Sequence, residues 1–511
     1  MHWITLPEPH PDAPLAFCDL SSAKAWLAGQ PQAQAMHMLN KISQQIDAIQ
    51  VSSLTPATAI ELLNLLRGAA VPAAGAVEAR FTRKPLPLLD DDHRCFEAAQ
   101  QLWLKLGTAY LRLAPHFPPA EKALPLNRAA CAFRMVQYCH FLAARECPVD
   151  IDRLLFAVLA QAESTGVLRH PLSDPDFRHL GDSHIAGHLA WAFLLRLIDP
   201  YRLSAAQFAV ANRAISRWRE LAGFQSAPDD DPRAHSLDLT ALFGTPLPEG
   251  IPRWLEIRRV MRKIEQRLAA LQSGEAPESL KLGRELSGAA CIRLLHELQD
   301  HLDVHVAQSS TEIGELELAF GPDHAYAILT GEMPSGGAQL DSGSATLAHQ
   351  RVAMFGFDRV STLPTAVKKL IVPSEKWMLV DGKAVRAADA QARRRLAPCL
   401  IAGSRDGEPR LGILLGLRSL SGGGLQADLN WYRQRVEAGS LAGLPGKERS
   451  AAFIPAFLLS EGNNRSLIVP ASAGVRLNSP LGLSGLPMQR VTPNEVLERG
   501  VDFVRYAIDP A

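Results

Sequence analysis

The chain has 511 residues, which is too long for one hydrophobic core and indicates about two to four domains. Hydrophobic residues make up 47% and charged residues 21% of the chain, which excludes an intrinsically disordered protein. Lysine plus arginine and aspartate plus glutamate number 53 each, so no overall field favours nucleic acid or an anionic membrane. Any anion-binding site must therefore come from a local cluster of cations.

The cysteines and the N-terminal sequence indicate the cellular compartment. Seven cysteines are scattered without a CxxC pair, which is typical of reduced thiols in the cytosol. The start of the chain lacks a basic region followed by an apolar one, so we expect no signal peptide. No uncharged apolar run reaches the ~18 residues of a membrane span. We therefore expect a cytoplasmic protein.

From Ser22 to about Gln308, apolar residues recur at three- and four-residue steps, which predicts helices. One helix should begin with Thr55 as N-cap and Pro56 at its first position, and end at Gly68. The connections are mostly short, which favours an all-α helical bundle or an array of helical hairpins. A proline- and acid-rich break at 224–250 is either a surface loop or an internal boundary.

After residue 310 or so, the pattern changes to short alternating segments separated by Gly, Pro, Asn and Ser. This spacing is typical of an all-β barrel or sandwich. The predicted fold class is therefore multidomain α and β. We predict an α-helical domain at 1–308, a connecting segment at 309–344 and a β domain at 345–511.

Several motifs in both parts resemble those of a mainly beta-proteobacterial family of PilZ-like proteins. In the second part they are "WMLVDGKAVR", "PRLGILLGLRSLSGGGLQADLNWY", "AFIPAFLL", "SLIVPASAG" and "RVTPNEVLERGVDFVRYAI". In the first part they are "SSAKAWLAGQP" and "LIDPYRLSAAQFAVANR". The resemblance implies a helical body that carries a β-barrel similar to PilZ domains, which are receptors for cyclic di-GMP.

The PilZ site implied by this resemblance has an RxxxR segment and a [D/N]x[S/A]xxG turn. Arginine forks suit phosphates and the guanine edge, and small residues let the backbone approach the base. Asp381 matches the acidic position, but Lys383 replaces the small residue and Arg386 replaces the glycine. The upstream arginines are also farther apart than in the family. The predicted ligand-binding residues are Arg351, Arg359, Lys368, Lys369, Asp381, Lys383 and Arg386.

The same stretch has a second interpretation that needs no ligand. Asp381-Gly382 lies between two strand-like segments, and Asp-Gly is a preferred pair for a type I′ hairpin turn. The densest basic run, Arg393-Arg394-Arg395, is either an anion or partner site or a solvated loop beside an edge strand.

Two histidine pairs have the spacing of metal ligands on one helix face, His184 with His188 and His301 with His305. Neither comes with an HExxH motif, so these four residues are weak candidates and we predict no metal site. Trp431 and Tyr432 lie beside arginines, a pattern that stacks bases in some proteins, but core packing is the commoner use. We therefore expect no nucleic-acid partner.

The sequence also lacks GxSxG, a Walker loop and a GxGxxG after a strand. We therefore predict a non-enzymatic signalling or adaptor protein without a cofactor, with cyclic di-GMP as its possible ligand. Its helical domain would bind a protein partner. One alternative is a ligand-free scaffold whose barrel mediates protein contacts or oligomerisation, and a more distant one is a histidine-based metalloenzyme.

Overall fold

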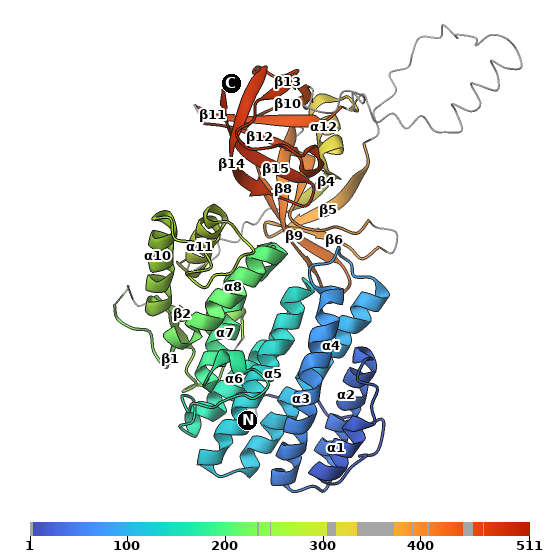
Figure 1. Ribbon diagram of the computed structural model, residues 1–511, viewed down its shortest axis with the longest axis vertical. Coiled ribbons are helices and arrows are strands. Elements are labelled where there is room, and N and C mark those ends of the chain that lie inside the picture. Colours follow the sequence, from blue (N-terminus) through green and yellow to red (C-terminus); the bar gives the residue numbers. More distant parts are fainter. Residues whose placement is uncertain are drawn as a thin grey trace, which may run out of the picture. The chain divides into compact units, whose positions relative to one another are not determined.

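The computed structural model describes most of the chain, and Figure 1 shows its helices and strands. It divides into two compact units, Met1–Gln308 with Arg418–Ser421 and Ser309–Leu417 with Gly422–Ala511. The described residues are 4–231, 233, 235–245, 247–303, 313–334, 372–389, 393–405, 408–442, 453–462 and 464–510.

The first unit is mainly helical, as the sequence predicts. Its apolar side chains form one continuous core cluster, to which nearly every helix contributes. The longer helices are α1 Leu20–Ala28, α2 Ala35–Val51, α3 Pro56–Phe81, α4 Asp90–Leu113, α5 Ala123–Leu142, α6 Val149–Ser164, α7 Ile185–Leu197, α8 Ala205–Trp218, α10 Arg258–Gln272 and α11 Gly288–Asp303.

Helix α3 begins as predicted but does not end where predicted. The Thr55 hydroxyl accepts a hydrogen bond from the Thr58 backbone amide at 3.2 Å, and Pro56 is the first helical residue. The predicted end at Gly68 is wrong, because the helix continues to Phe81. Its buried residues recur on one face as far as Phe81, so packing outweighs the low helix propensity of glycine.

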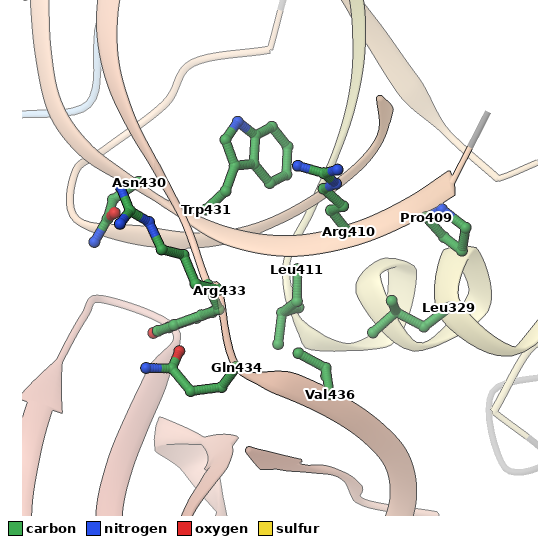
Figure 2. Close-up of a pocket in the computed structure, with 10 residues that line it drawn as sticks. Leu329, Pro409, Arg410, Leu411, Asn430, Trp431, Arg433, Gln434 and Val436 are labelled. Atoms are coloured by element: carbon green, nitrogen blue, oxygen red, sulfur yellow. The ribbon is translucent and has the colours of Figure 1, made fainter. Parts of the chain in front are cut away.

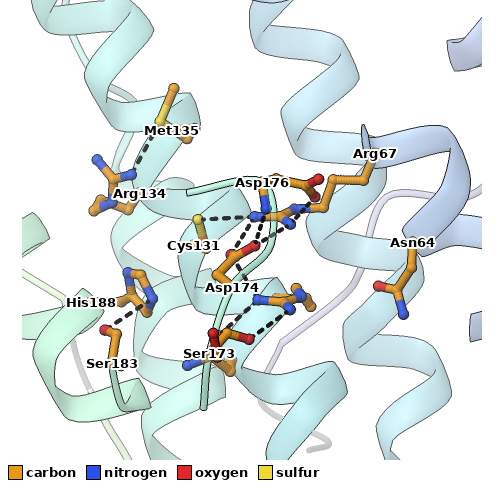
Figure 3. A network of polar contacts seen from close by, with 12 residues as sticks. Asn64, Arg67, Cys131, Arg134, Met135, Ser173, Asp174, Asp176, Ser183 and His188 are labelled. Carbon is orange, nitrogen blue, oxygen red and sulfur yellow. Dashed lines mark hydrogen bonds and ion pairs between the residues drawn. The ribbon is translucent and has the colours of Figure 1, made fainter. Parts of the chain in front are cut away.

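Helix α5 lies at the centre of this unit and packs against α4, α6 and α7. Nearly all of its side chains are buried, including Arg128. Figure 3 shows the polar network that surrounds it. Arg67 of α3 and Arg128 both pair with Asp174 at 2.7 Å, and Asp174 is only 3% exposed. Buried charges are tolerated when they are paired in this way.

The predicted break at 224–250 lies inside the first unit. It contains part of a three-stranded antiparallel sheet and the short helix α9 (Leu239–Phe243). Strand β3 (Trp254–Glu256) pairs with both β1 (Gly223–Gln225) and β2 (Ser236–Asp238).

One helix of the described chain, α3, is long and apolar enough to cross a membrane by length and composition. Half of its most apolar window is buried inside the first unit. Core helices of soluble proteins also meet these criteria, so this is weak evidence for a membrane span.

The second unit contains two closed six-stranded barrels. The strands of the first barrel follow the order β4-β5-β6-β9-β8-β7, and β4 closes it by pairing with β7. Helix α12 (Pro322–Thr330) follows β4 and packs against β7. These strands are β4 Gly314–Phe320, β5 Ser374–Val380, β6 Lys383–Arg386, β7 Cys399–Arg405, β8 Glu408–Ser419 and β9 Leu425–Trp431.

The second barrel repeats this arrangement, with the order β10-β11-β12-β15-β14-β13. When the strands of each barrel are numbered along the chain, both barrels have the order 1-2-3-6-5-4. The strands are β10 Arg435–Ala442, β11 Pro455–Glu461, β12 Asn464–Pro470, β13 Leu481–Ser484, β14 Arg490–Arg499 and β15 Phe503–Pro510.

The two barrels share one apolar cluster, to which Leu400 and Ile413 of the first and Phe457 and Ile468 of the second contribute. A helical N-terminal part followed by β-barrels confirms the predicted fold class. The sequence predicted one barrel, and the structure has two. The segment at 309–344, predicted to be a connection, supplies β4 and α12.

Candidate functional site

Asp381 and Gly382 form the tight turn between β5 and β6. Their φ angles are 50° and 74°, and Val380 pairs with Lys383 directly across the turn. Two consecutive positive φ angles in a two-residue loop are characteristic of a type I′ hairpin turn. The local conformation of Asp381 and Gly382 is therefore explained without a ligand.

The two cations that follow this turn both have carboxylate partners in the first barrel. Lys383 forms an ion pair with Asp428 of β9. The side chain of Arg386 is only 8% exposed and contacts Glu375 at 2.6 Å. Its guanidinium also lies 5.3 Å from the ring centre of Trp377. The predicted ligand-binding role of Asp381, Lys383 and Arg386 stays a prediction.

The arginine run at 393–395 also contacts Glu375 or its partner Arg386. The Arg395 Nε donates a hydrogen bond to Glu375 at 3.0 Å, and the Arg393 carbonyl accepts one from Arg386 at 3.2 Å. Arg394 belongs to this run as well. Because Glu375 lies between Arg386 and Arg395, its charge neutralises part of the cluster.

Five of the predicted residues lie outside the described part of the chain. They are Arg351, Arg359, Lys368, Lys369 and His305.

The described histidines have separate partners. The Nδ1 of His184 accepts a hydrogen bond from the Gly187 amide at the start of α7, and its Nε2 lies against Glu220. The buried His188 is 3.3 Å from the Ser183 hydroxyl. Burial and nearby arginines lower the pKa of His188 well below its usual value. His301 is 3.5 Å from Arg202. No group of three or more possible metal ligands occurs among the residues that the structure describes.

A pocket of about 590 Å³ lies where the first barrel is followed by the second, and Figure 2 shows the side chains around it. It combines arginines, amides and aromatic rings with a few apolar side chains. The lining residues are Leu329, Pro409, Arg410, Leu411, Asn430, Trp431, Tyr432, Arg433, Gln434 and Val436.

Trp431, the last residue of β9, lies on two glycines of neighbouring strands. A Cβ added to Gly412 of β8 would come within 2.8 Å of the Trp431 Cε3. A Cβ added to Gly403 of β7 would come within 3.2 Å of its Cη2. The indole therefore packs closely on both strands, where the absence of a side chain leaves room for it.

Tyr432 is held by the second barrel. Its hydroxyl donates a hydrogen bond to the Glu498 carboxylate at 2.7 Å, and the Arg505 guanidinium lies 5.1 Å from its ring centre. Burial, followed by the charge of Glu498, raises the pKa of Tyr432 well above its ordinary value. The hydroxyl therefore remains protonated and keeps donating at neutral pH.

The two arginines of the pocket differ from Lys383, Arg386 and Arg395. Within the described chain, neither Arg410 nor Arg433 has an ion-pair or hydrogen-bond partner. Arg410 is half-buried and Arg433 is exposed. In the part of the chain that the structure describes, guanidinium groups without ion pairs line the same pocket as an indole. Together they provide charge, hydrogen-bond donors and an aromatic ring for an anionic aromatic ligand.

The sequence contained part of this signal, since Trp431, Tyr432 and Arg433 are consecutive. The same pattern is also typical of ordinary strand packing, which is the use that we expect from the sequence. The pocket itself could not be predicted, because Leu329 and Arg410 come near Trp431 only when the barrels fold.

Comparison with known proteins gives one match, and it lies in the helical part. Residues 21–229 match the family model described as "Cyclic-di-GMP receptor FimW, N-terminal domain". Searches of curated proteins and of solved structures found no match. The matched segment covers less than half of the chain and ends before the barrels begin. The helical part is therefore similar to the N-terminal domain of a cyclic-di-GMP receptor.

Proposed function

We propose that this protein is a non-enzymatic cyclic di-GMP signalling protein that binds its ligand in the pocket between the two barrels. The observation that carries the proposal is that Arg410 and Arg433 line the same pocket as Trp431 and have no ion-pair partner among the described residues. The match of residues 21–229 to a receptor family supports the choice of ligand.

The chemistry of the pocket suits this ligand. Cyclic di-GMP carries two phosphodiesters and two guanines, and guanidinium groups bind both phosphates and the O6/N7 edge of guanine. The indole of Trp431 offers a stacking face, and such stacking contributes about 1–3 kcal/mol per base. Asn430 adds amide hydrogen-bond groups. A volume of about 590 Å³ lies in the range of small-molecule sites.

The first predicted position, around Asp381, Lys383 and Arg386, remains a second possible site. There the cations already have acidic partners, which a phosphate would have to displace. We favour the pocket between the barrels because Arg410 and Arg433 have no ion pair within the described residues that a phosphate would have to displace. In both cases the barrels would be PilZ-like, with a site that departs from the usual motif.

We further propose that the protein acts in the cytoplasm by binding a protein partner through its helical unit. A ligand changes such an interaction only if it binds two arrangements of the protein with different affinities.

Isothermal titration calorimetry with cyclic di-GMP tests the proposal. Arg410→Ala, Arg433→Ala and Trp431→Ala should each weaken binding by about tenfold or more, which corresponds to about 1.4 kcal/mol. Arg476→Ala, an exposed arginine outside the pocket, is the matched control and should leave the affinity unchanged. Loss of binding in Lys383→Ala or Arg386→Ala alone would place the site at the β5–β6 hairpin instead.

The alternative is a ligand-free scaffold whose barrels mediate protein contacts or oligomerisation. It predicts no heat of binding at high micromolar cyclic di-GMP in the intact protein. It also predicts that a change in the oligomeric state follows substitutions on the barrel surface.

A further inference from the structure

Helix α10 carries five cations and one acid, the exposed Glu265, which lies one turn after Arg262 at the edge of the polar face. Its buried residues, Val260, Met261, Ile264, Leu268 and Leu271, form the opposite face. The polar face follows three- and four-residue steps, which place side chains in one row along a helix. The residues in this row, which we call the α10 basic row, are Arg259, Arg262, Lys263, Gln266 and Arg267.

The cations of the α10 basic row have no acidic partner among the residues that the structure describes. Arg259 and Arg262 are exposed. The Lys263 amino group donates a hydrogen bond to the side-chain oxygen of Gln266 at 3.4 Å. The Nε of Arg267 is buried without a hydrogen-bond partner. The row therefore carries about four positive charges over about 12 Å of helix, because each residue rises about 1.5 Å.

The N-terminal end of the same helix already binds carboxylates. Arg258, the first residue of α10, contacts Asp229 at 3.4 Å and Asp231 at 3.2 Å. Both aspartates belong to an acidic loop of the same unit, far from α10 in sequence. This intramolecular contact pairs a cation of the same helix with carboxylates. The acidic loop contacts Arg258 and leaves the α10 basic row unoccupied within the described chain.

The geometry favours a protein segment over a membrane or a nucleic acid. Membrane-surface helices insert their apolar face, but the apolar face of α10 is already part of the core. Nucleic-acid binding usually draws on a wider basic field, and this chain has a formal net charge of zero. A row about 12 Å long fits two turns of an acidic helix, with carboxylates at three- and four-residue spacing.

We propose that the α10 basic row is a docking surface for an acidic helical segment of a partner protein. This surface lies outside the segment matched by the receptor family and is separate from the pocket between the barrels. The proposal does not depend on cyclic di-GMP binding.

The test uses the full chain and two synthetic peptides of the same composition. One peptide carries four glutamates at three- and four-residue spacing on a helix, and the other carries them in a non-periodic order. Fluorescence anisotropy at low and moderate salt measures binding. We expect the periodic peptide to bind more tightly and to lose affinity as salt rises.

The diagnostic variant is Arg259→Glu/Arg262→Glu/Lys263→Glu, which should weaken binding of the periodic peptide by about tenfold or more. The control Lys24→Glu/Arg169→Glu/Arg217→Glu changes three other cations of the helical unit and should change the affinity less than about twofold. Arg259→Gln/Arg262→Gln should give an intermediate loss, and circular dichroism checks that each variant is folded.

Three results would overturn the proposal. The first is equal binding of the two peptides, and the second is an equal loss in the control variant. The third is a short DNA duplex that binds more tightly than the peptide and loses affinity in the charge-reversed variant. That third result would identify the row as a nucleic-acid surface instead.

Discussion

At the scale of single residues, the buried ion pairs of the helical unit are the main electrostatic feature. Arg67 and Asp174 are 1% and 3% exposed and lie 2.7 Å apart. Burial alone would raise the pKa of Asp174, but the hydrogen bond and charge of Arg67 and the charge of Arg128 lower it below its usual value. Asp174 therefore stabilises the unit above the unfolded pKa of aspartate, and this contribution is lost as the pH falls.

We predict that Arg67→Met destabilises the helical unit by about 3–5 kcal/mol, because it leaves Asp176 and part of Asp174 without a counter-charge. Urea denaturation followed by the helical circular dichroism signal measures this loss. The control Arg94→Met removes an exposed partner of Asp91 and should leave the urea midpoint nearly unchanged. Equal losses in the two variants would contradict the assigned role of burial.

Asp502 gives the opposite pH dependence in the second unit. Burial raises its pKa from 3.8 to about 6, although its carboxylate accepts a hydrogen bond from the Leu400 amide at 3.0 Å. Because the folded pKa is the higher one, the contribution of this group is fully present below about pH 4 and is lost as the pH rises to about 6. The ionised carboxylate therefore costs stability at neutral pH.

Asp502→Asn keeps an oxygen that accepts from Leu400 but cannot ionise. We predict that it raises the melting temperature of the barrels at pH 8 by about 2–4 °C and leaves it nearly unchanged at pH 4. Thermal melts across this pH range measure the difference. A gain that is equally large at pH 4 would show that the charge is not its cause.

At the scale of elements, the turn between β5 and β6 can be tested for a structural role as opposed to a role in ligand binding. Gly382 has a φ of 74°, and a side chain there costs about 1–2 kcal/mol. We predict that Gly382→Ala destabilises the second unit by this amount and changes the affinity for cyclic di-GMP by less than about twofold. Gly422→Ala is the control, because a Cβ there meets open space and the φ of Gly422 is not positive. A selective loss of affinity in Gly382→Ala would restore the turn as a ligand site.

Two features of the fold could be predicted from the sequence because each depends on residues that are neighbours in the chain. The Asp381-Gly382 turn and the Thr55 N-cap are local, so the sequence alone predicted them. The end of α3 depends on packing of residues as far as Phe81, and a single Gly68 did not stop the helix. The pocket depends on Gly403 and Gly412 beneath Trp431, a contact that no local pattern reveals.

At the scale of the whole chain, the repeated 1-2-3-6-5-4 order is the least predictable feature. Closure of the first barrel pairs β4 with β7, although more than seventy residues separate them in the sequence. The strand β13, Leu481–Ser484, is also too short to give a clear alternating pattern. Sequence periodicity therefore predicted β-structure correctly, but it did not reveal that the strands form two barrels.

The division into two compact units leads to the last prediction. Each unit has its own apolar core, so we expect two separable unfolding transitions in calorimetry. Cyclic di-GMP at about 100 times its dissociation constant should stabilise the unit that binds it by about 2.7 kcal/mol. That corresponds to an upward shift of about 5 °C or more in the transition of the barrels.

Arg67→Met identifies the transitions, because it should lower only that of the helical unit. Arg410→Ala/Arg433→Ala should abolish the shift caused by cyclic di-GMP without moving either transition in its absence, since these side chains have no partners in the described chain. If the ligand raised the helical transition instead, the binding site would lie in the helical unit, which contains the segment that matches the receptor family, and the pocket between the barrels would be excluded.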